Sequence, residues 1–277
     1  MLFALALLLA SAPQRIVSTT PSITELLFAL GLGPKVVGVT NYCRYPAEAR
    51  TLPRIGTYIQ PDMERIAELR PDLVVIQKNP VQLQARLQRL GLRVLELEYD
   101  SVDQTYSAIA QLAEAGGVAR RGVELNEKLR GELAAIQAKT AGRERRSMVF
   151  IIGRNPGAVD GLIAVGRKSY LTELMTIAGG RNAFADTIAP YPKIALEELL
   201  ARNPYTIVDM GDMANTETVT EQQRKAVVGL WTRHSALGAV RHGRVFAVSS
   251  DVFVVPGPRM VEAARAFAAM LHPEVFR

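Results

Sequence analysis

The chain has 277 residues, 48% of them apolar and 22% charged, so it is long enough to form two domains with substantial cores. Its net charge of +6 is modest, and the basic residues do not form the aromatic-interleaved stripe that is typical of nucleic-acid binding. Cys43 is the only cysteine, which excludes an intrachain disulfide and a cysteine-ligated metal cluster and predicts a buried, inert thiol.

The first twelve residues, MLFALALLLASA, carry no charge and end in a small-x-small sequence that is typical of a signal-peptidase site. The stretch is too short to span a bilayer. We interpret residues 1–12 as a secretory signal peptide that is removed after Ala12. Cys43 lies far beyond that site and is therefore not a lipid-anchor cysteine. We expect a periplasmic protein with no stable membrane insertion.

Strands and helices alternate through residues 13–100, which form the predicted N-terminal lobe. Apolar runs predict strands at residues 16–18, 36–39, 73–76 and 93–97. Helical spacing predicts helices at residues 22–30, 62–69 and 81–90. Ser22 and Glu25 match a capping box, and Asp62 is expected to cap the next helix. This alternation favours a parallel sheet.

Residues 101–142 contain no proline and have apolar residues at helical spacing, which predicts a long helix. Gly116 and Gly117 are expected to kink or split it, since each glycine costs a helix roughly 1 kcal/mol. A single helix this long cannot be buried in one small domain, so we interpret the segment as a strut between two lobes. The alternative is two consecutive helices of one domain.

The sequence after this segment repeats the sequence before it, which favours the strut. Two short patterns recur in the same order with the same internal spacing, one leading to a glycine and the other to a proline. The matching residues are Thr24, Glu25, Leu26 and Gly31 with Thr172, Glu173, Leu174 and Gly179, and Glu64 and Pro71 with Glu197 and Pro204. We therefore predict a second α/β lobe at residues 143–277.

In the second lobe, apolar runs predict strands at residues 149–152, 207–209 and 245–248, and residues 259–271 form an amphipathic helix. Asp209 and Asp212 follow a strand, where paired acids are common on solvated loops. The basic segment Arg143-Glu-Arg-Arg146 is interpreted as a solvated linker.

Ligand sites in two-lobed α/β proteins lie between the lobes, beside the carboxyl ends of the strands. Tyrosine is frequent in the corresponding loops, and its large apolar face and single hydroxyl suit a flat, partly polar ligand. The candidate contacts on these loops are Tyr42, Tyr58, Gln77, Tyr191, Asp251 and Phe253.

The sequence contains no catalytic pattern. There is no HExxH, nucleophile elbow, phosphate loop or GxGxxG motif, so we predict no enzyme activity and no resident metal. A zinc- or manganese-binding importer protein needs several histidines in its cleft, and this chain has three, all late in the sequence.

The chain resembles the periplasmic substrate-binding proteins of ABC importers for cobalamin, haem and ferric siderophores, and is most similar to the cobalamin-binding branch. The resemblance rests on RIVSTTPSITELLFALG, VVGVTNYCRYPAEA, PDMERIAELRPDLVV, residues 191–204, and Ser250, Asp251, Pro258 and Arg259. It implies an α/β fold of two doubly wound parallel-sheet lobes, joined by a long helix, with the ligand cleft between them.

The resemblance also implies a function. The protein would capture a cobalamin-like corrinoid and deliver it to a permease dimer with its ATPase subunits; haem or a ferric siderophore is the alternative. Tyr42 and Asp251 match the cobalamin branch, whereas Tyr58 and Tyr191 stand at tryptophan positions, Gln77 replaces another tryptophan and Val255 replaces an arginine. Glu64 and Glu197 match the glutamates that meet arginines of the permease.

Overall fold

The computed structural model describes residues 12–78, 82–211 and 219–276, and they divide into two compact units. The first unit comprises residues 12–98 and 106–126, and the second comprises residues 99–105 and 127–276. Each is an α/β unit built on a sheet of mainly parallel strands. The predicted signal peptide, apart from Ala12, lies outside the described residues.

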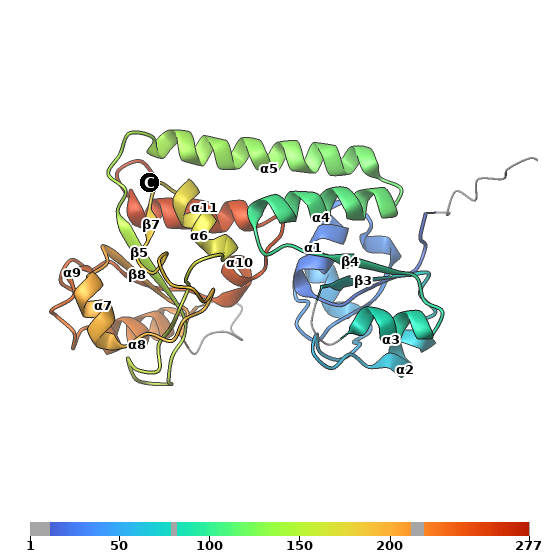
Figure 1. Ribbon diagram of the computed structural model, residues 1–277, viewed down its shortest axis with the longest axis horizontal. Coiled ribbons are helices and arrows are strands. Elements are labelled where there is room, and N and C mark those ends of the chain that lie inside the picture. The colour runs from blue at the N-terminus through green and yellow to red at the C-terminus, as the bar shows by residue number, and fades with distance from the viewer. Residues whose placement is uncertain (1–11, 79–81, 212–218, 277) are drawn as a thin grey trace, which may run out of the picture. The chain divides into compact units, whose positions relative to one another are not determined.

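The first unit contains a four-stranded parallel sheet in the order β2-β1-β3-β4 (Figure 1). Its strands are β1 (Ile16–Ser18), β2 (Val36–Val39), β3 (Leu73–Gln77) and β4 (Val94–Leu97). The helices between them are α1 (Pro21–Ala29), η1 (Gly33–Lys35), η2 (Ala47–Thr51), α2 (Met63–Glu68) and α3 (Leu83–Arg89). Because β2 and β3 pair with opposite sides of β1, the sheet is doubly wound, and loops gather at its carboxyl edge.

The four predicted strands of this unit are confirmed, and the burial of β3 shows why its sequence is apolar throughout. The side chains of Leu73, Val74, Val75 and Ile76 are at most 1% exposed, so both faces of the strand are covered. Continuous apolar runs are typical of parallel strands in this position.

The predicted capping box at Ser22 is wrong. The helix begins one residue earlier, and its N-cap is Thr20, whose hydroxyl accepts a hydrogen bond from the amide of Ile23 at 3.4 Å. Pro21 occupies the first helical position, where its fixed φ suits a helix and its missing N–H is not needed. The Asp62 cap is confirmed, because its carboxylate accepts from the Arg65 amide at 2.9 Å.

The second unit contains a five-stranded sheet in the order β6-β5-β8-β9, with β7 also paired to β5. Its strands are β5 (Ser147–Gly153), β6 (Ile163–Ala164), β7 (Arg181–Asn182), β8 (Thr206–Asp209) and β9 (Val245–Ala247). All pairs are parallel except β5 with β6. The helices are α6 (Tyr170–Ile177), α7 (Leu196–Arg202), α8 (Glu221–Trp231), α9 (Gly238–Arg241), α10 (Ser250–Val254) and α11 (Met260–Leu271).

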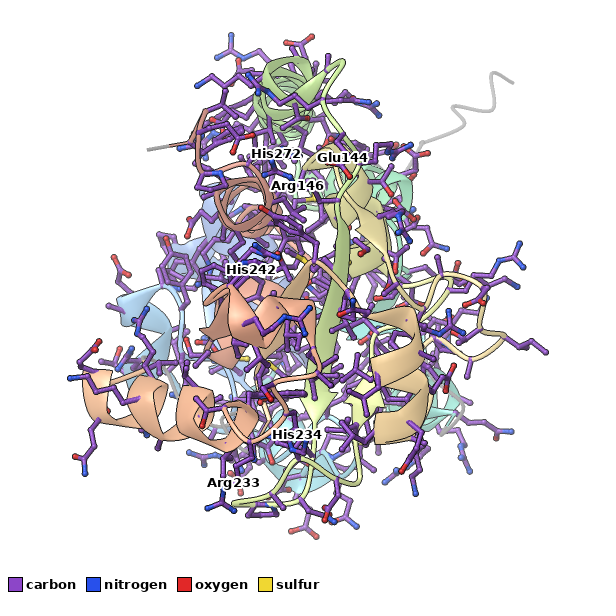
Figure 2. The ribbon with its side chains drawn as sticks, turned by 90° about the vertical axis from the view of Figure 1, so that its left-hand side faces the viewer. Glu144, Arg146, Arg233, His234, His242 and His272 are labelled. Carbon is purple, nitrogen blue, oxygen red and sulfur yellow. The ribbon has the colours of Figure 1, made fainter. Side chains whose placement is uncertain are left out.

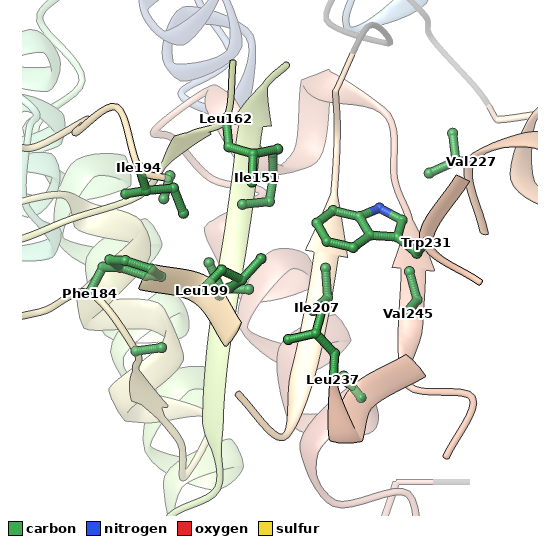
Figure 3. Close-up of a cluster of buried hydrophobic side chains, with 14 of the residues drawn as sticks. Ile151, Leu162, Phe184, Ile194, Leu199, Ile207, Val227, Trp231, Leu237 and Val245 are labelled. Carbon is green, nitrogen blue, oxygen red and sulfur yellow. The ribbon is translucent and has the colours of Figure 1, made fainter. Parts of the chain in front are cut away.

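A hydrophobic cluster on one face of this sheet is centred on the only tryptophan. Trp231 ends α8 and is fully buried beside Ile207 of β8 and Val245 of β9 (Figure 3). Leu199 and Phe184 extend the same cluster across β5. Burying a large apolar side chain contributes about 1.5–3 kcal/mol, so this cluster is a principal source of stability in the unit.

The segment interpreted as a strut forms two helices, α4 (Val102–Ala115) and α5 (Ala119–Thr140). The predicted break occurs at Gly116 and Gly117, where the chain reverses and the helices pack side by side (Figure 1). The Asn126 side-chain amide donates to the Tyr106 carbonyl at 3.0 Å across this pair. The long helix that links the two units is α5, whose 22 residues begin in the first unit and end in the second.

The internal repeat is visible in the backbone. Gly31 after α1 and Gly179 after α6 have φ values of +72° and +79°, a left-handed conformation that glycine adopts without a side-chain clash. The residues before the two matched prolines, Arg70 and Asn203, are also left-handed, with φ of +45° and +38°. The same three hydrogen bonds close both helices: Leu30 to Leu26, Gly31 to Phe28 and Leu32 to Leu27 in one, and Ala178 to Leu174, Gly179 to Thr176 and Gly180 to Met175 in the other.

Within the described ranges, no helix has the length and apolar character that crossing a membrane requires.

Candidate functional site

The carboxyl edge of the first sheet carries three of the expected ligand residues. Tyr42 lies in the loop after β2, Tyr58 lies in the segment between η2 and α2, and Gln77 ends β3. The Tyr42 side chain is 50% exposed, and those of Tyr58 and Gln77 are half-buried. The loops of the two tyrosines are joined, because the Asn41 amide donates to the Gly56 carbonyl at 2.9 Å. The fold therefore brings Tyr42 and Tyr58 to neighbouring loops.

Arg54 holds the Tyr42 loop in place. Its Nη1 donates to the carbonyls of Thr40 at 2.8 Å and Cys43 at 3.0 Å, on either side of the tyrosine. Its Nη2 donates to the Arg50 carbonyl at 3.0 Å. A planar guanidinium that bridges several carbonyls fixes the loop more firmly than isolated bonds would. Arg54 is thus a positioning residue that sequence reasoning missed, since no local pattern marks its carbonyl partners.

Cys43 is fully buried beneath the same loop. Its sulfur lies 3.2 Å from the Thr24 hydroxyl and 3.1 Å from the Thr40 hydroxyl. Burial raises the pKa of the Cys43 thiol above its ordinary value, and the hydrogen bonds from Thr24 and Thr40 oppose this only in part. The thiolate fraction at a given pH is therefore smaller than for an exposed cysteine.

We expect Cys43 to resist labelling by Ellman's reagent in the native protein at mildly alkaline pH, and to react once guanidinium chloride unfolds the chain. Burial blocks the reagent, and the raised pKa lowers the amount of thiolate. As a control, Ala141→Cys in a Cys43→Ala background places a thiol at an exposed position and should react at once. Equal native rates for Cys43 and this control would show that the thiol is accessible.

In the second unit, Tyr191 lies on a loop whose backbone is hydrogen-bonded to residues 164–166. Its neighbours on both sides are fixed by main-chain bonds, from the Gly166 amide to the Pro190 carbonyl at 2.8 Å and from the Ala164 amide to the Pro192 carbonyl at 3.0 Å. The Tyr191 side chain remains 45% exposed. A fixed backbone with a free aromatic face is suited to contact a ligand with little loss of chain entropy.

Asp251 and Phe253 have different positions although they are two residues apart. Asp251 is half-buried. It lies in the first turn of α10, which is the next element after β9. Phe253 is only 7% exposed and packs at ring-centroid distances of 5.5 Å from Phe150 and 5.3 Å from Phe267. Phe253 therefore packs in the core of the second unit, and its contact with a ligand stays a prediction. Two residues of an α-helix are separated by about 200° around its axis, so the two side chains leave α10 on opposite sides.

A buried ion pair holds the carboxyl edge of the second sheet. The Nε of Arg154, directly after β5, lies 3.0 Å and 3.3 Å from the two carboxylate oxygens of Asp209, at the end of β8. Trp231 Nε1 donates to the same carboxylate at 2.6 Å. Both charged side chains are 0% exposed. The expectation that Asp209 lies on a solvated loop is therefore wrong; Asp212 lies outside the described residues.

The Arg154 side chain also organises the loop after β5. Its Nη1 donates to the carbonyls of Asn155 at 3.2 Å and Ala158 at 3.4 Å. The ion pair therefore joins two adjacent strand ends, the end of α8 and one loop of the carboxyl edge. In an apolar surrounding such a cluster is stable only when each charge is compensated, as these are.

Glu64 and Glu197 occupy equivalent places in the two units, in the first turns of α2 and α7. Both are exposed, and neither carboxylate has an ion-pair partner within 4.0 Å in the part of the chain that the structure describes. Each carboxylate stabilises its helix by about 0.3–1 kcal/mol, because the N-terminal end of a helix carries partial positive charge. Apart from this effect, both charges are available to a partner.

Among the described residues, no three His, Cys, Asp or Glu side chains are grouped so that they would hold a metal ion. The carboxyl edge of each sheet carries aromatic and polar side chains, which are suited to non-covalent contact with a ligand. Residues 16–252 match the periplasmic binding protein family. The chain belongs to this family.

Relatives of this binding protein carry different ligands in their names. It is 30% identical over 267 residues to the vitamin B12-binding protein of Salmonella paratyphi A, covering 96% of this chain and 92% of that one. The periplasmic vitamin B12-binding protein BtuF of Vibrio cholerae superposes with a TM-score of 0.78 at 26% identity, covering 94% and 96% of the two chains. A periplasmic haem-binding protein from Pseudomonas aeruginosa superposes with a TM-score of 0.81 at 26% identity, covering 95% and 94%.

Proposed function

We propose that this binding protein captures a cobalamin-like corrinoid in the periplasm and delivers it to the permease of an ABC importer. The observation that carries this proposal is the similarity along nearly the whole chain to a vitamin B12-binding protein. The proposed contacts are Tyr42, Tyr58 and Gln77 in the first unit and Tyr191 and Asp251 in the second. A secretory signal peptide at residues 1–12 would direct the protein to the periplasm.

The proposed contacts fit the chemistry of a corrinoid. A corrin ring is broad and flat and is surrounded by amide side chains, so it needs aromatic faces and a few hydrogen-bonding groups. The exposed faces of Tyr42 and Tyr191 supply the first requirement. The Gln77 amide and the Asp251 carboxylate supply the second, because they can accept hydrogen bonds from the amide groups of the ligand.

Haem is the second candidate, and two observations favour it. Tyrosinate is a known ligand of haem iron, and the Tyr42 and Tyr191 phenols are both about half exposed. A haem-binding protein also shares the fold, with a TM-score of 0.81. In that case one phenolate would coordinate iron instead of lying flat against a ring.

The two candidates are separated by titrating the purified protein with cyanocobalamin, hemin and a ferric siderophore, using calorimetry and absorption spectra. We expect saturable binding of one cyanocobalamin per chain, with weaker or no response to the others. A shifted haem absorption band together with no heat from cyanocobalamin would overturn the corrinoid proposal in favour of haem. No binding of any of the three would overturn both.

Tyr58→Ala and Tyr191→Ala are each expected to weaken ligand binding by roughly 1–3 kcal/mol, the cost of removing a buried aromatic anchor. Calorimetry with the ligand identified above gives the affinity of each variant. Tyr45→Ala is the matched control, because Tyr45 is 47% exposed in the same loop as Tyr42 and is not a proposed contact. If both variants bind like the parent protein, these tyrosines do not belong to the site.

A further inference from the structure

A basic pocket lies at the amino edge of the second sheet, at the opposite edge from the loops that carry Tyr191 and Asp251. Its lining comes from the segments that precede β5, β8 and β9, together with β7 and α9. The pocket has a volume of about 290 Å³. Since a water molecule takes about 30 Å³ of liquid, this is room for roughly ten waters or a small molecule of similar size.

The lining is strongly positive. It contains five arginines and one histidine against one carboxylate, that of Glu144, and the basic residues are Arg145, Arg146, Arg181, Arg241, His242 and Arg244. Of these, only Arg146 has an acidic partner among the described residues, Glu274 at 3.4 Å. The segment containing Arg145 and Arg146 is therefore not simply a solvated linker, since it forms one wall of this pocket.

Three of the guanidinium groups are held by the fold before any ligand arrives. Arg244 Nε donates to the Tyr205 carbonyl at 2.8 Å, and Arg241 Nη1 donates to the Ser235 and Ala236 carbonyls at 2.9 Å and 2.8 Å. Arg146 donates through Nη1 to the Leu271 carbonyl. Arg146 and Arg244 also stack on the Tyr205 ring, at 4.7 Å and 3.8 Å from its centroid.

This arrangement concentrates positive charge while leaving donors unused. A guanidinium has five N–H groups, and the bonds above use only one nitrogen of each. The guanidinium groups around the pocket repel one another, and two of them, those of Arg146 and Arg244, stack on the same tyrosine ring. An anion bound between the guanidinium groups would offset this repulsion. Guanidinium groups bind phosphate and carboxylate oxygens through paired hydrogen bonds.

We propose that this pocket binds a small, multiply charged oxyanion of the pyrophosphate class. A phosphate group could also belong to a lipid, but binding to a membrane surface requires apolar anchors beside the basic residues. In the described chain, the large exposed apolar side chains are Tyr42, Tyr45, Ile59, Leu90, Val123, Ile188 and Tyr191, and none lines the pocket. A free anion is therefore the proposed ligand, and this proposal does not depend on the importer function.

The test is calorimetric titration of the full chain with inorganic pyrophosphate at low ionic strength. We expect saturable binding, which Arg145→Ala combined with Arg181→Ala weakens by about tenfold or more, since charged hydrogen bonds are lost. Both side chains are exposed and without a hydrogen-bond partner among the described residues, so the substitutions should not affect folding.

The matched control removes two other exposed arginines, outside the pocket, through Arg167→Ala combined with Arg233→Ala. Figure 2 shows Arg233 at the opposite end of the second unit from Arg146. The control should bind pyrophosphate like the parent. No heat from pyrophosphate, or an equal loss in the control, would overturn the proposal, as would arginine-dependent binding to anionic phospholipid vesicles without binding to pyrophosphate.

Discussion

Asp209→Ala is expected to lower the free energy of unfolding by about 3–5 kcal/mol, because it leaves the Arg154 charge buried without its partner. The pair is fully enclosed, and Trp231 Nε1 would lose its acceptor at the same time. Denaturant unfolding followed by circular dichroism measures the effect. Because the pair joins the ends of β5 and β8, we also expect the loop after β5 to exchange its amide hydrogens faster.

The matched control is an arginine–aspartate pair at the surface of the same unit. Asp186 lies 2.7 Å from Arg202, with an aspartate side chain that is 67% exposed. Solvent screens this pair, so Asp186→Ala should leave the unfolding midpoint nearly unchanged. If the Asp209→Ala variant is as stable as the Asp186→Ala variant, the buried pair contributes no more to the free energy of unfolding than the exposed pair does.

Glu64→Lys combined with Glu197→Lys is expected to reduce stimulation of the importer's ATPase by about tenfold or more while leaving ligand affinity unchanged. The prediction rests on the proposed function. A two-fold permease would present the same basic pocket twice, and the repeat supplies one exposed glutamate in each unit. Reversing both charges would then turn attraction into repulsion at the two proposed contacts.

ATPase activity of the reconstituted importer, with wild-type or variant binding protein, measures this effect. The control is Glu48→Lys combined with Glu262→Lys, which changes the net charge equally at exposed glutamates in first turns of helices, one per unit. Equal stimulation by the parent and the Glu64/Glu197 variant would leave these residues with only their helix-stabilising role. An equal loss in both double variants would indicate a general charge effect instead of docking.

Local patterns predicted most secondary-structure elements because their causes are local. The strands β1 and β2 occur at their predicted bounds, and Asp62 caps α2 through an amide three residues away. The helix break at Gly116 and Gly117 follows from the low helix propensity of glycine. At Ser22 the pattern was misleading, since Pro21 fits the first helical position and moves the cap to Thr20.

The candidate sites were less predictable, because exposure depends on packing between distant segments. Tyr42 and Phe253 both follow strands, yet one is half exposed and the other packs between Phe150 and Phe267. No sequence pattern distinguishes these two outcomes. Arg146 illustrates the same point, since its neighbours Tyr205 and Leu271 are far away in the chain.

The sequence by itself determined the α/β class, the internal repeat, the long helix and the equivalent places of Glu64 and Glu197, because periodicity, glycine and proline act within a few residues. Only the tertiary structure decided that Arg154, Asp209 and Trp231 form one buried cluster, and that arginines from four segments converge on the amino-edge pocket. Whether a charge is buried and paired depends on which strands lie side by side, and strand order is a property of the folded chain.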